Sequence, residues 1–150
     1  MFDKFGAMTA AQINQTAEGL FNEGDIDSLW KLAEENGLEP WMVDGYIYGE
    51  LPEFCDATTA AIGKLEIEKQ EKEVKAYNSK IPADPIVEYL IGQCEKEEVA
   101  LAIRLPEKSL MKCLKHIEAE ARKKVSRSRP WLSDAAVYQM AKEYYLGGTK

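Results

Sequence analysis

Two groups of side chains in this chain have the types and spacing to bind a partner. The first group is basic and ends in an aromatic residue: Arg122, Lys123, Lys124, Arg127, Arg129 and Trp131. Cations beside an aromatic ring can hold phosphates and stack a nucleobase. The same residues also suit a structural role, in which the cations offset a helix dipole and Trp131 packs as a staple ahead of the helix that Ser133 caps. The sequence leaves both interpretations open.

The second group combines carboxylates with aromatic rings. Its members are Glu39, Trp41, Asp44, Tyr48, Glu50, Glu53 and Asp56. Aromatic rings next to carboxylates suit a protein interface that faces a basic partner. The alternative is that Trp41, together with Tyr46 and Phe54, fills the core of a small lobe.

Few residues have the pattern of a catalytic or metal site. The single histidine, His116, lies between Lys115 and Ile117, and no serine or cysteine pairs with it in a known motif. The three cysteines, Cys55, Cys94 and Cys113, are far apart, which argues against a zinc site or a disulfide framework. The sequence has neither a GxGxxG nor a GxxxxGK phosphate loop. We therefore expect a non-enzyme without cofactor or metal, and catalysis by His116 remains a third hypothesis.

Charge is distributed unevenly along the chain. The 150 residues carry a net charge of −7, made of −13 over residues 1–103, +6 over residues 104–130 and zero over residues 131–150. An acidic body repels DNA and approaches basic protein surfaces easily. The basic segment could contact phosphate or pair with the acidic part of the same protein.

The hydrophobic pattern is helical almost throughout and predicts an all-α protein. Thr9 and Asp25 are placed to cap the first two helices, and Pro40 suits the first turn of a third. Gly24, Asn36–Gly37 and Gly49 are placed to end these helices. No alternating run is long enough for a confident strand, and a short strand could lie only at residues 51–55.

The remaining helices define the expected organisation. Asp56 or Thr58 begins a longer helix whose second half, residues 66–75, is charged and looks solvated. Asp84–Pro85 begins another helix, and a basic helix runs from about Lys108 to Val125. We expect two helical lobes joined near residues 66–85: a lobe over residues 1–56, a charged connecting helix over residues 57–83 and a lobe over residues 84–150.

Features of membrane and exported proteins are missing from the sequence. No apolar run approaches the ~20 residues that span a bilayer. The first residues lack the charged and apolar regions of a signal peptide. We expect a cytoplasmic protein.

The C-terminal part resembles a known family. Its pattern runs from Pro106-Glu107-Lys108-Ser109-Leu110 and Cys113, through Ile117 and Glu120-Ala121-Arg122-Lys123, to Leu132-Ser133-Asp134, Val137-Tyr138, Ala141 and Tyr144-Tyr145. This order, over about 40 residues, resembles the PcfK-like family of small proteins from conjugative elements and phages of gut bacteria. Residues 2–6 and 33–37 are similar to a module in the same kind of mobile-element protein.

The resemblance implies a binding function and no catalytic residue. Some members or relatives of the family are anti-CRISPR proteins that inhibit the RNA-guided nuclease of type II systems. The expected partner is that nuclease or its guide-RNA complex, with DNA binding or cleavage blocked by charge mimicry through residues 39–56 or 66–75. The alternative is a nucleic-acid-binding accessory protein of a conjugative element that acts through residues 122–131.

Overall fold

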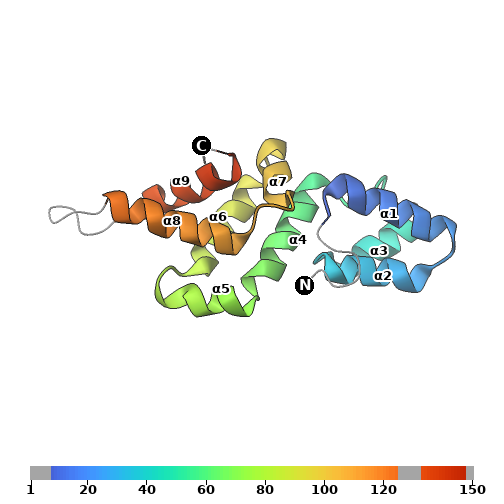
Figure 1. Ribbon diagram of the computed structural model, residues 1–150. Coiled ribbons are helices and arrows are strands. Elements are labelled where there is room, and N and C mark those ends of the chain that lie inside the picture. The colour runs from blue at the N-terminus through green and yellow to red at the C-terminus, as the bar shows by residue number, and fades with distance from the viewer. Residues whose placement is uncertain (1–7, 125–132, 148–150) are drawn as a thin grey trace.

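The computed structural model describes residues 8–124 and 133–147, and in these ranges the protein is all-α, as predicted. The described ranges contain nine α-helices, one 3₁₀ turn and no strand, and Figure 1 shows their arrangement. The helices are α1 (Ala10–Asn22), α2 (Ile26–Glu35), α3 (Pro40–Ile47), α4 (Ala57–Lys69), α5 (Lys72–Ala76), α6 (Ala83–Gln93), α7 (Glu97–Arg104), α8 (Leu110–Lys124) and α9 (Asp134–Tyr145), with the 3₁₀ turn at Tyr77–Ser79.

The buried apolar side chains form two clusters. One contains residues between Ala10 and Ala60, and the other contains residues between Ala61 and Tyr145. We name the parts of the chain that hold them the N-terminal lobe (residues 8–60) and the C-terminal lobe (residues 61–147). Figure 1 shows the lobes side by side, with α4 running between them. The boundary between the two hydrophobic cores therefore lies within α4, between Ala60 and Ala61, which is N-terminal to the expected join at residues 66–85.

Local signals place the helix ends of the N-terminal lobe. Thr9 and Gln12 form a capping box at α1, as Thr9 Oγ1 accepts from the Gln12 N–H at 3.2 Å. Asp25 Oδ1 accepts from the Ser28 N–H at 3.2 Å to cap α2, and Pro40 stands at the first position of α3. These predicted caps are confirmed because each depends on residues within one helical turn.

The charged segment at residues 66–75 differs from the expected solvated helix. Helix α4 ends at Lys69 and α5 begins at Lys72, and the Glu68 side chain is only 6% exposed. Glu68 Oε1 accepts a hydrogen bond of 2.9 Å from the N–H of Leu110, at the start of α8. The carboxylate is buried because it satisfies a helix N-terminus 42 residues along the chain.

Two other boundaries differ from the sequence prediction. Helix α6 begins at Ala83, whose N–H donates to Asn78 Oδ1 at 3.2 Å, so Asn78 rather than Asp84 supplies the acceptor there. Residues 51–55 are bends and loop, not a strand. At α9 the predicted cap is confirmed, since Ser133 Oγ accepts from the Ala136 N–H at 3.1 Å.

Arg104 links the two lobes. Its side chain, 2% exposed, extends from α7 and donates to the backbone oxygens of Met8 and Ala60 and to Asn36 Oδ1. Nearby, the backbones of Gly37 and Gly63 touch: a Cβ built on Gly63 would lie 2.1 Å from the carbonyl oxygen of Asn36. These contacts hold the end of α2 against α4 and so orient the N-terminal lobe.

Candidate partner-binding site

Helix α3 presents an exposed stripe of three residues from the predicted acidic and aromatic group. Trp41, Asp44 and Tyr48 are three and four positions apart, so they project from one face of the helix. Trp41 is 59% exposed and Tyr48 is 76% exposed. Large aromatic rings this exposed are typical of contact surfaces rather than of cores.

The opposite face of α3 is fixed by a chain of aromatic contacts. The Tyr46 ring packs edge-on against Phe21 of α1 at 5.6 Å and against Phe54 at 5.2 Å. Phe54 is 1% exposed and belongs to the N-terminal core. The core interpretation is therefore confirmed for Tyr46 and Phe54 and is wrong for Trp41, which faces solvent. A role of Trp41 in a protein interface stays a prediction.

The loop between α3 and α4 carries three more of the predicted carboxylates. Glu50, Glu53 and Asp56 are exposed, and Asp56 Oδ1 also caps α4 by accepting from the Thr59 N–H at 2.7 Å. Glu39, at the start of α3, is exposed as well. All seven predicted residues of the acidic and aromatic group thus lie at the surface of one lobe.

Two hollows lie between α3, the loops on either side of it and α4, and Trp41 borders the smaller one. The smaller has a volume of about 120 Å³ and is bordered by Trp41, Glu53 and Asp56. The larger, about 470 Å³, is bordered by Glu39 and by Glu66 of α4. They share Met42 and Thr59 as lining residues, so they adjoin each other, and we name the pair of hollows the trough.

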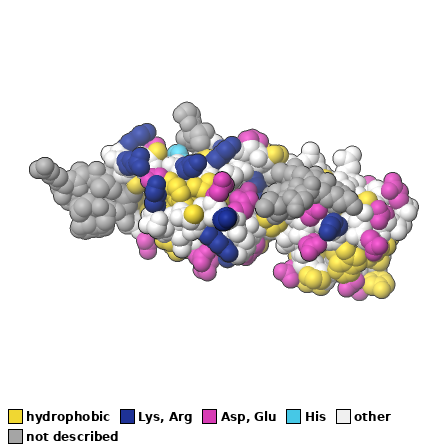
Figure 2. Space-filling model, turned by 60° about the horizontal axis from the view of Figure 1, so that its bottom comes forward, with side chains coloured by type: hydrophobic (Ala, Val, Ile, Leu, Met, Phe, Trp, Pro, Cys, Tyr) yellow, Lys and Arg dark blue, Asp and Glu magenta, His cyan; other side chains and the backbone are white. Residues whose placement is uncertain are grey.

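The charge of the N-terminal lobe is strongly negative. Residues 8–60 contain eleven Asp and Glu residues against one lysine, Lys31, a balance of −10. The described residues of the C-terminal lobe carry fourteen residues of each sign. In Figure 2, magenta carboxylates and a yellow apolar patch cover the N-terminal lobe on the right, and most dark blue side chains lie on the other lobe. The acidic and aromatic surface therefore lies in a negative electrostatic potential.

Trp30 of α2 also lies at the surface of the N-terminal lobe, where it lines neither hollow of the trough. It is 37% exposed and borders a third hollow, of about 400 Å³, together with Lys31 and Pro40. The sequence holds no signal that separates Trp30 from Leu29, which is fully buried.

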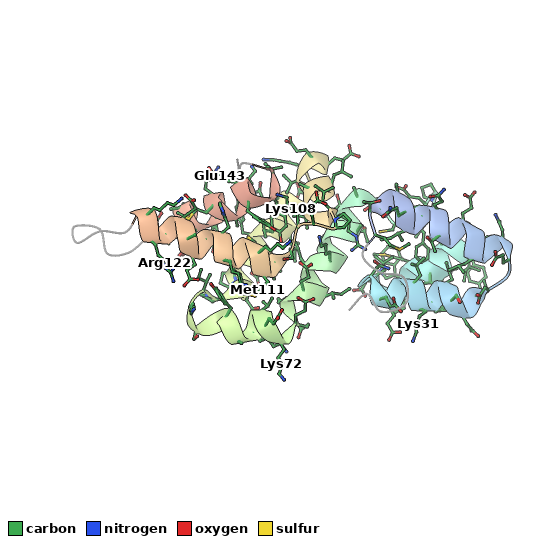
Figure 3. All side chains as sticks on the ribbon, in the orientation of Figure 1. Lys31, Lys72, Lys108, Met111, Arg122 and Glu143 are labelled. Atoms are coloured by element: carbon green, nitrogen blue, oxygen red, sulfur yellow. The ribbon has the colours of Figure 1, made fainter. Side chains whose placement is uncertain are left out.

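The predicted basic group is only partly described. Arg122 and Lys123 are exposed near the end of α8, where each pairs with a glutamate of the same helix, Glu118 at 2.9 Å and Glu120 at 3.2 Å. Figure 3 shows Arg122 at the end of the protein far from the N-terminal lobe. Lys124 ends α8, and its side chain lies outside the description, as do residues Arg127, Arg129 and Trp131. The side chains of Arg122 and Lys123 are 74% and 71% exposed, so both cations keep contact with solvent. Their exposed ion pairs with Glu118 and Glu120 contribute little to stability.

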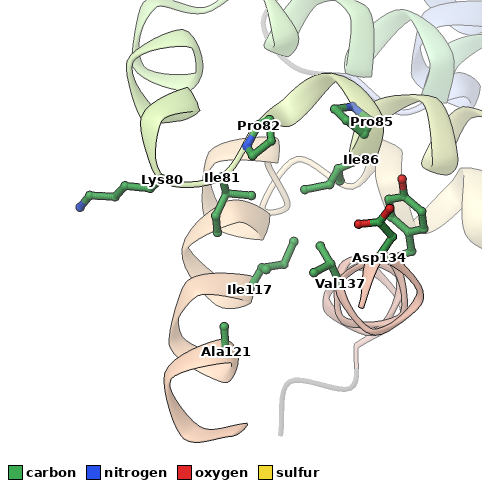
Figure 4. Close-up of a pocket in the computed structure, with 10 residues that line it drawn as sticks. Lys80, Ile81, Pro82, Pro85, Ile86, Ile117, Ala121, Asp134 and Val137 are labelled. Atoms are coloured by element: carbon green, nitrogen blue, oxygen red, sulfur yellow. The ribbon is translucent and has the colours of Figure 1, made fainter. Parts of the chain in front are cut away.

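The C-terminal lobe has an apolar groove of about 300 Å³ between α6, α8 and α9. Figure 4 shows Ile86, Ile117 and Val137 pointing toward one another in this groove, while Lys80 points away from them.

The nucleophilic and imidazole side chains sit among structural contacts. Burial raises the pKa of Cys55 to about 12 and that of Cys94 to about 11, and it also raises the pKa of Cys113, so all three thiols stay protonated at neutral pH. The His116 ring, half-buried, lies 5.9 Å from the Tyr144 ring at the contact of α8 with α9. Within the described residues, no three His, Cys, Asp or Glu side chains converge in a way that could hold a metal ion. Nor does any described helix have the length and apolar character to cross a bilayer.

Comparison with known proteins leaves the family open. The PcfK-like resemblance and the functions it implies stay predictions. The chain matched no protein-family model, no curated protein and no solved structure.

Proposed function

We propose that the protein is an anti-CRISPR protein of a phage or mobile element that binds the type II RNA-guided nuclease and inhibits DNA binding or cleavage. It acts by binding rather than by catalysis, in the cytoplasm of the bacterial host. The observation that carries the proposal is the balance of −10 within residues 8–60, on a lobe that also exposes Trp41 and Tyr48.

The physical argument is charge mimicry. RNA-guided nucleases hold nucleic acid in positively charged channels that recognise its backbone. Carboxylates on a folded lobe offer such a channel negative charge without a strand to cleave, and exposed aromatic rings offer flat surfaces like those of bases. The family resemblance of the C-terminal part supports the same function.

A cleavage assay with purified, guide-loaded type II nuclease tests the proposal. The protein at micromolar concentration should protect target DNA, and the protection should weaken as salt rises because the contacts are electrostatic. Absence of both protection and a complex, across the type II nucleases assayed, would contradict the proposal.

A matched pair of triple variants assigns the effect to the acidic lobe. Asp44→Asn, Glu50→Gln and Glu53→Gln together remove three charges from the N-terminal lobe, and Glu88→Gln, Glu95→Gln and Glu143→Gln remove three exposed charges from the C-terminal lobe. We expect the first set to weaken inhibition about tenfold, which is ~1.4 kcal/mol of binding free energy, and the second set to leave it within about twofold. Equal losses would mean that only net charge matters.

The second candidate function is nucleic-acid binding through residues 122–131, favoured by the exposure of Arg122 and Lys123. In that case the protein should shift a labelled DNA or RNA in a gel at low salt, and alanine at Arg122, Lys123, Lys124, Arg127 and Arg129 should abolish the shift. An unshifted probe at low salt would exclude this function.

A further inference from the structure

The trough beside Trp41 has the composition of a site for a cationic side chain. Its lining includes the apolar side chains of Met42 and Ile62 and the carboxylates of Glu39, Glu53, Asp56 and Glu66. Glu66 is already paired with Lys69 at 3.4 Å, which leaves the other three carboxylates for a guest. None of the residues that line the two hollows is a lysine or an arginine. The one lysine of the N-terminal lobe, Lys31, borders the separate hollow at Trp30. A guest with positive charge is therefore favoured here over a neutral or an anionic one.

The size of the smaller hollow indicates what kind of guest fits. Its volume of about 120 Å³ is several times the ~30 Å³ that one water occupies in the liquid, and well below the ~300–1,000 Å³ typical of small-molecule sites. It has room for one side chain, and the adjoining hollow of about 470 Å³ has room for the residues next to it.

The Trp41 indole determines which cation suits the site better. Indole is the best aromatic face for a cation–π contact, and the ring borders the same hollow as Glu53 and Asp56. A guanidinium group is planar, stacks on an aromatic face and donates up to five hydrogen bonds, whereas an ammonium group is a strongly hydrated point charge. Asp56 already uses Oδ1 to cap α4, and a carboxylate has further acceptor sites on its two oxygens.

We infer that the trough receives an arginine side chain from a basic partner segment. The guanidinium stacks on Trp41 and donates to Glu53 and Asp56, and a neighbouring aliphatic side chain of the partner covers Met42 and Ile62. The identity of the partner rests on the proposed function, but recognition of an arginyl peptide does not.

Peptide titration tests the site directly. The probe is a peptide capped at both ends that contains Leu-Arg-Leu and has no charged group besides the arginine. Its controls replace the arginine with lysine or with citrulline, which keeps the shape and loses the charge. Isothermal titration calorimetry measures the affinity in the wild type and in the variants, and in the wild type the shift of the Trp41 indole N–H in a nitrogen–proton correlation spectrum shows that the peptide reaches this ring. We expect the arginine peptide to bind at least about tenfold more tightly than the citrulline peptide, with lysine in between.

Variants of the protein locate the binding. Trp41→Ala and Glu53→Gln should each weaken binding of the arginine peptide at least about fivefold. Trp30→Ala, at the separate hollow, should leave that affinity unchanged. Both Trp41 and Glu53 are exposed, so these substitutions should shift the unfolding free energy by no more than about 0.5 kcal/mol. Equal affinity for the citrulline peptide, or unchanged binding by Trp41→Ala, would overturn the inference.

The nuclease assay separates this inference from the proposed function. If the arginine peptide binds as expected and the nuclease is not inhibited, the inference about the trough is supported and the proposed function is contradicted. If the arginine and citrulline peptides bind equally and the nuclease is still inhibited, the inference fails and the proposed function stands.

Discussion

The side-chain amide of Asn14 forms two hydrogen bonds with the backbone of Cys55, 41 residues along the chain. The Cys55 N–H donates to Asn14 Oδ1 at 2.8 Å, and Asn14 Nδ2 donates to the Cys55 carbonyl at 2.6 Å. The amide thus satisfies both backbone groups of one loop residue and ties the loop to α1. Glu53 and Asp56 lie within two residues of Cys55 in the same loop, so Asn14 helps to position two carboxylates of the trough.

Asn14→Ala should therefore lower stability and loosen the loop. Loss of the amide leaves the N–H and C=O of Cys55 without these partners, at a cost of about 1–3 kcal/mol. Chemical denaturation measures the loss, and hydrogen exchange at residues 53–56 should speed up before that of the C-terminal lobe. Gln15→Ala, at an exposed position of the same helix, is the control and should change stability by less than about 0.5 kcal/mol. Equal effects of the two substitutions would contradict this role for Asn14.

Gly63→Ala should be among the most destabilising glycine-to-alanine substitutions in the described part of the chain. Its Cβ would lie 2.1 Å from the Asn36 carbonyl oxygen, and Gly37 on the other side of the contact has a φ of 72°, which other residues rarely adopt. Backbone must move, so we expect a loss of about 3 kcal/mol or more.

Gly92→Ala in α6 is the matched control for Gly63. A Cβ there would meet nothing within 4 Å, and alanine favours helix over glycine by about 0.5–1 kcal/mol. The midpoint temperature of thermal unfolding should therefore fall for Gly63→Ala and rise for Gly92→Ala. A harmless Gly63→Ala would show that α2 and α4 do not approach at this point.

Arg104→Leu should weaken the link between the lobes. The substitution leaves Asn36 Oδ1 and the backbone oxygens of Met8 and Ala60 without their guanidinium donor, and a buried acceptor left unsatisfied costs about 1–3 kcal/mol. Hydrogen exchange should increase at the end of α2 and the start of α4. A double-mutant cycle with Asn36→Ala should show coupling above about 0.5 kcal/mol, and simple additivity would contradict the contact.

Lys64 should make stability rise with pH in the alkaline range. Its ammonium group donates to the carbonyls of Ile103, Leu105 and Lys108 at 2.7–2.8 Å, and burial lowers its pKa from 10.5 to about 8. Between these two values the unfolded chain holds the proton that the folded protein has lost. The unfolding free energy therefore rises with pH there, by at most about 1.4 kcal/mol per pH unit from this group.

Denaturation of the wild type and of Lys64→Met between pH 7.5 and 10 measures this contribution. The difference between the two slopes isolates Lys64 from the tyrosines, cysteines and other lysines that titrate in the same range. The variant should be less stable at pH 7.5, because three carbonyls lose their donor, and its slope should be shallower. Parallel slopes would contradict the lowered pKa.

Tyr145→Phe should be neutral or stabilising. The Tyr145 ring is 1% exposed, and its hydroxyl is one of two buried side-chain polar atoms without a hydrogen-bond partner in the described part of the chain. Removing an unsatisfied buried hydroxyl at constant shape should raise the unfolding free energy by up to about 1 kcal/mol. A loss above about 1 kcal/mol would mean that the hydroxyl has a partner after all.

Much of the local structure could be predicted from sequence because its causes are local. The caps at Thr9, Asp25 and Ser133 each require only a side-chain oxygen within three residues of a free N–H. The seven acidic and aromatic residues of the candidate site were also identified from their types and spacing. What the spacing left open was which aromatic residues face solvent, since Trp41 and Phe54 look alike until α1 and the Asn14 contact place the loop.

The sequence by itself determined the all-α class, the helix starts at Thr9, Asp25 and Ser133 and the excess of carboxylates, because capping, periodicity and charge depend on neighbours along the chain. Only the tertiary structure decided where the core divides, that Glu68, Lys64 and Arg104 are buried, and that Trp41 and four carboxylates border one trough. The reason is physical: these side chains are placed by acceptors, donors and surfaces that lie tens of residues away, as the 68 residues between Asn36 and Arg104 show. Burial of a charged group is favourable only when those distant partners arrive together.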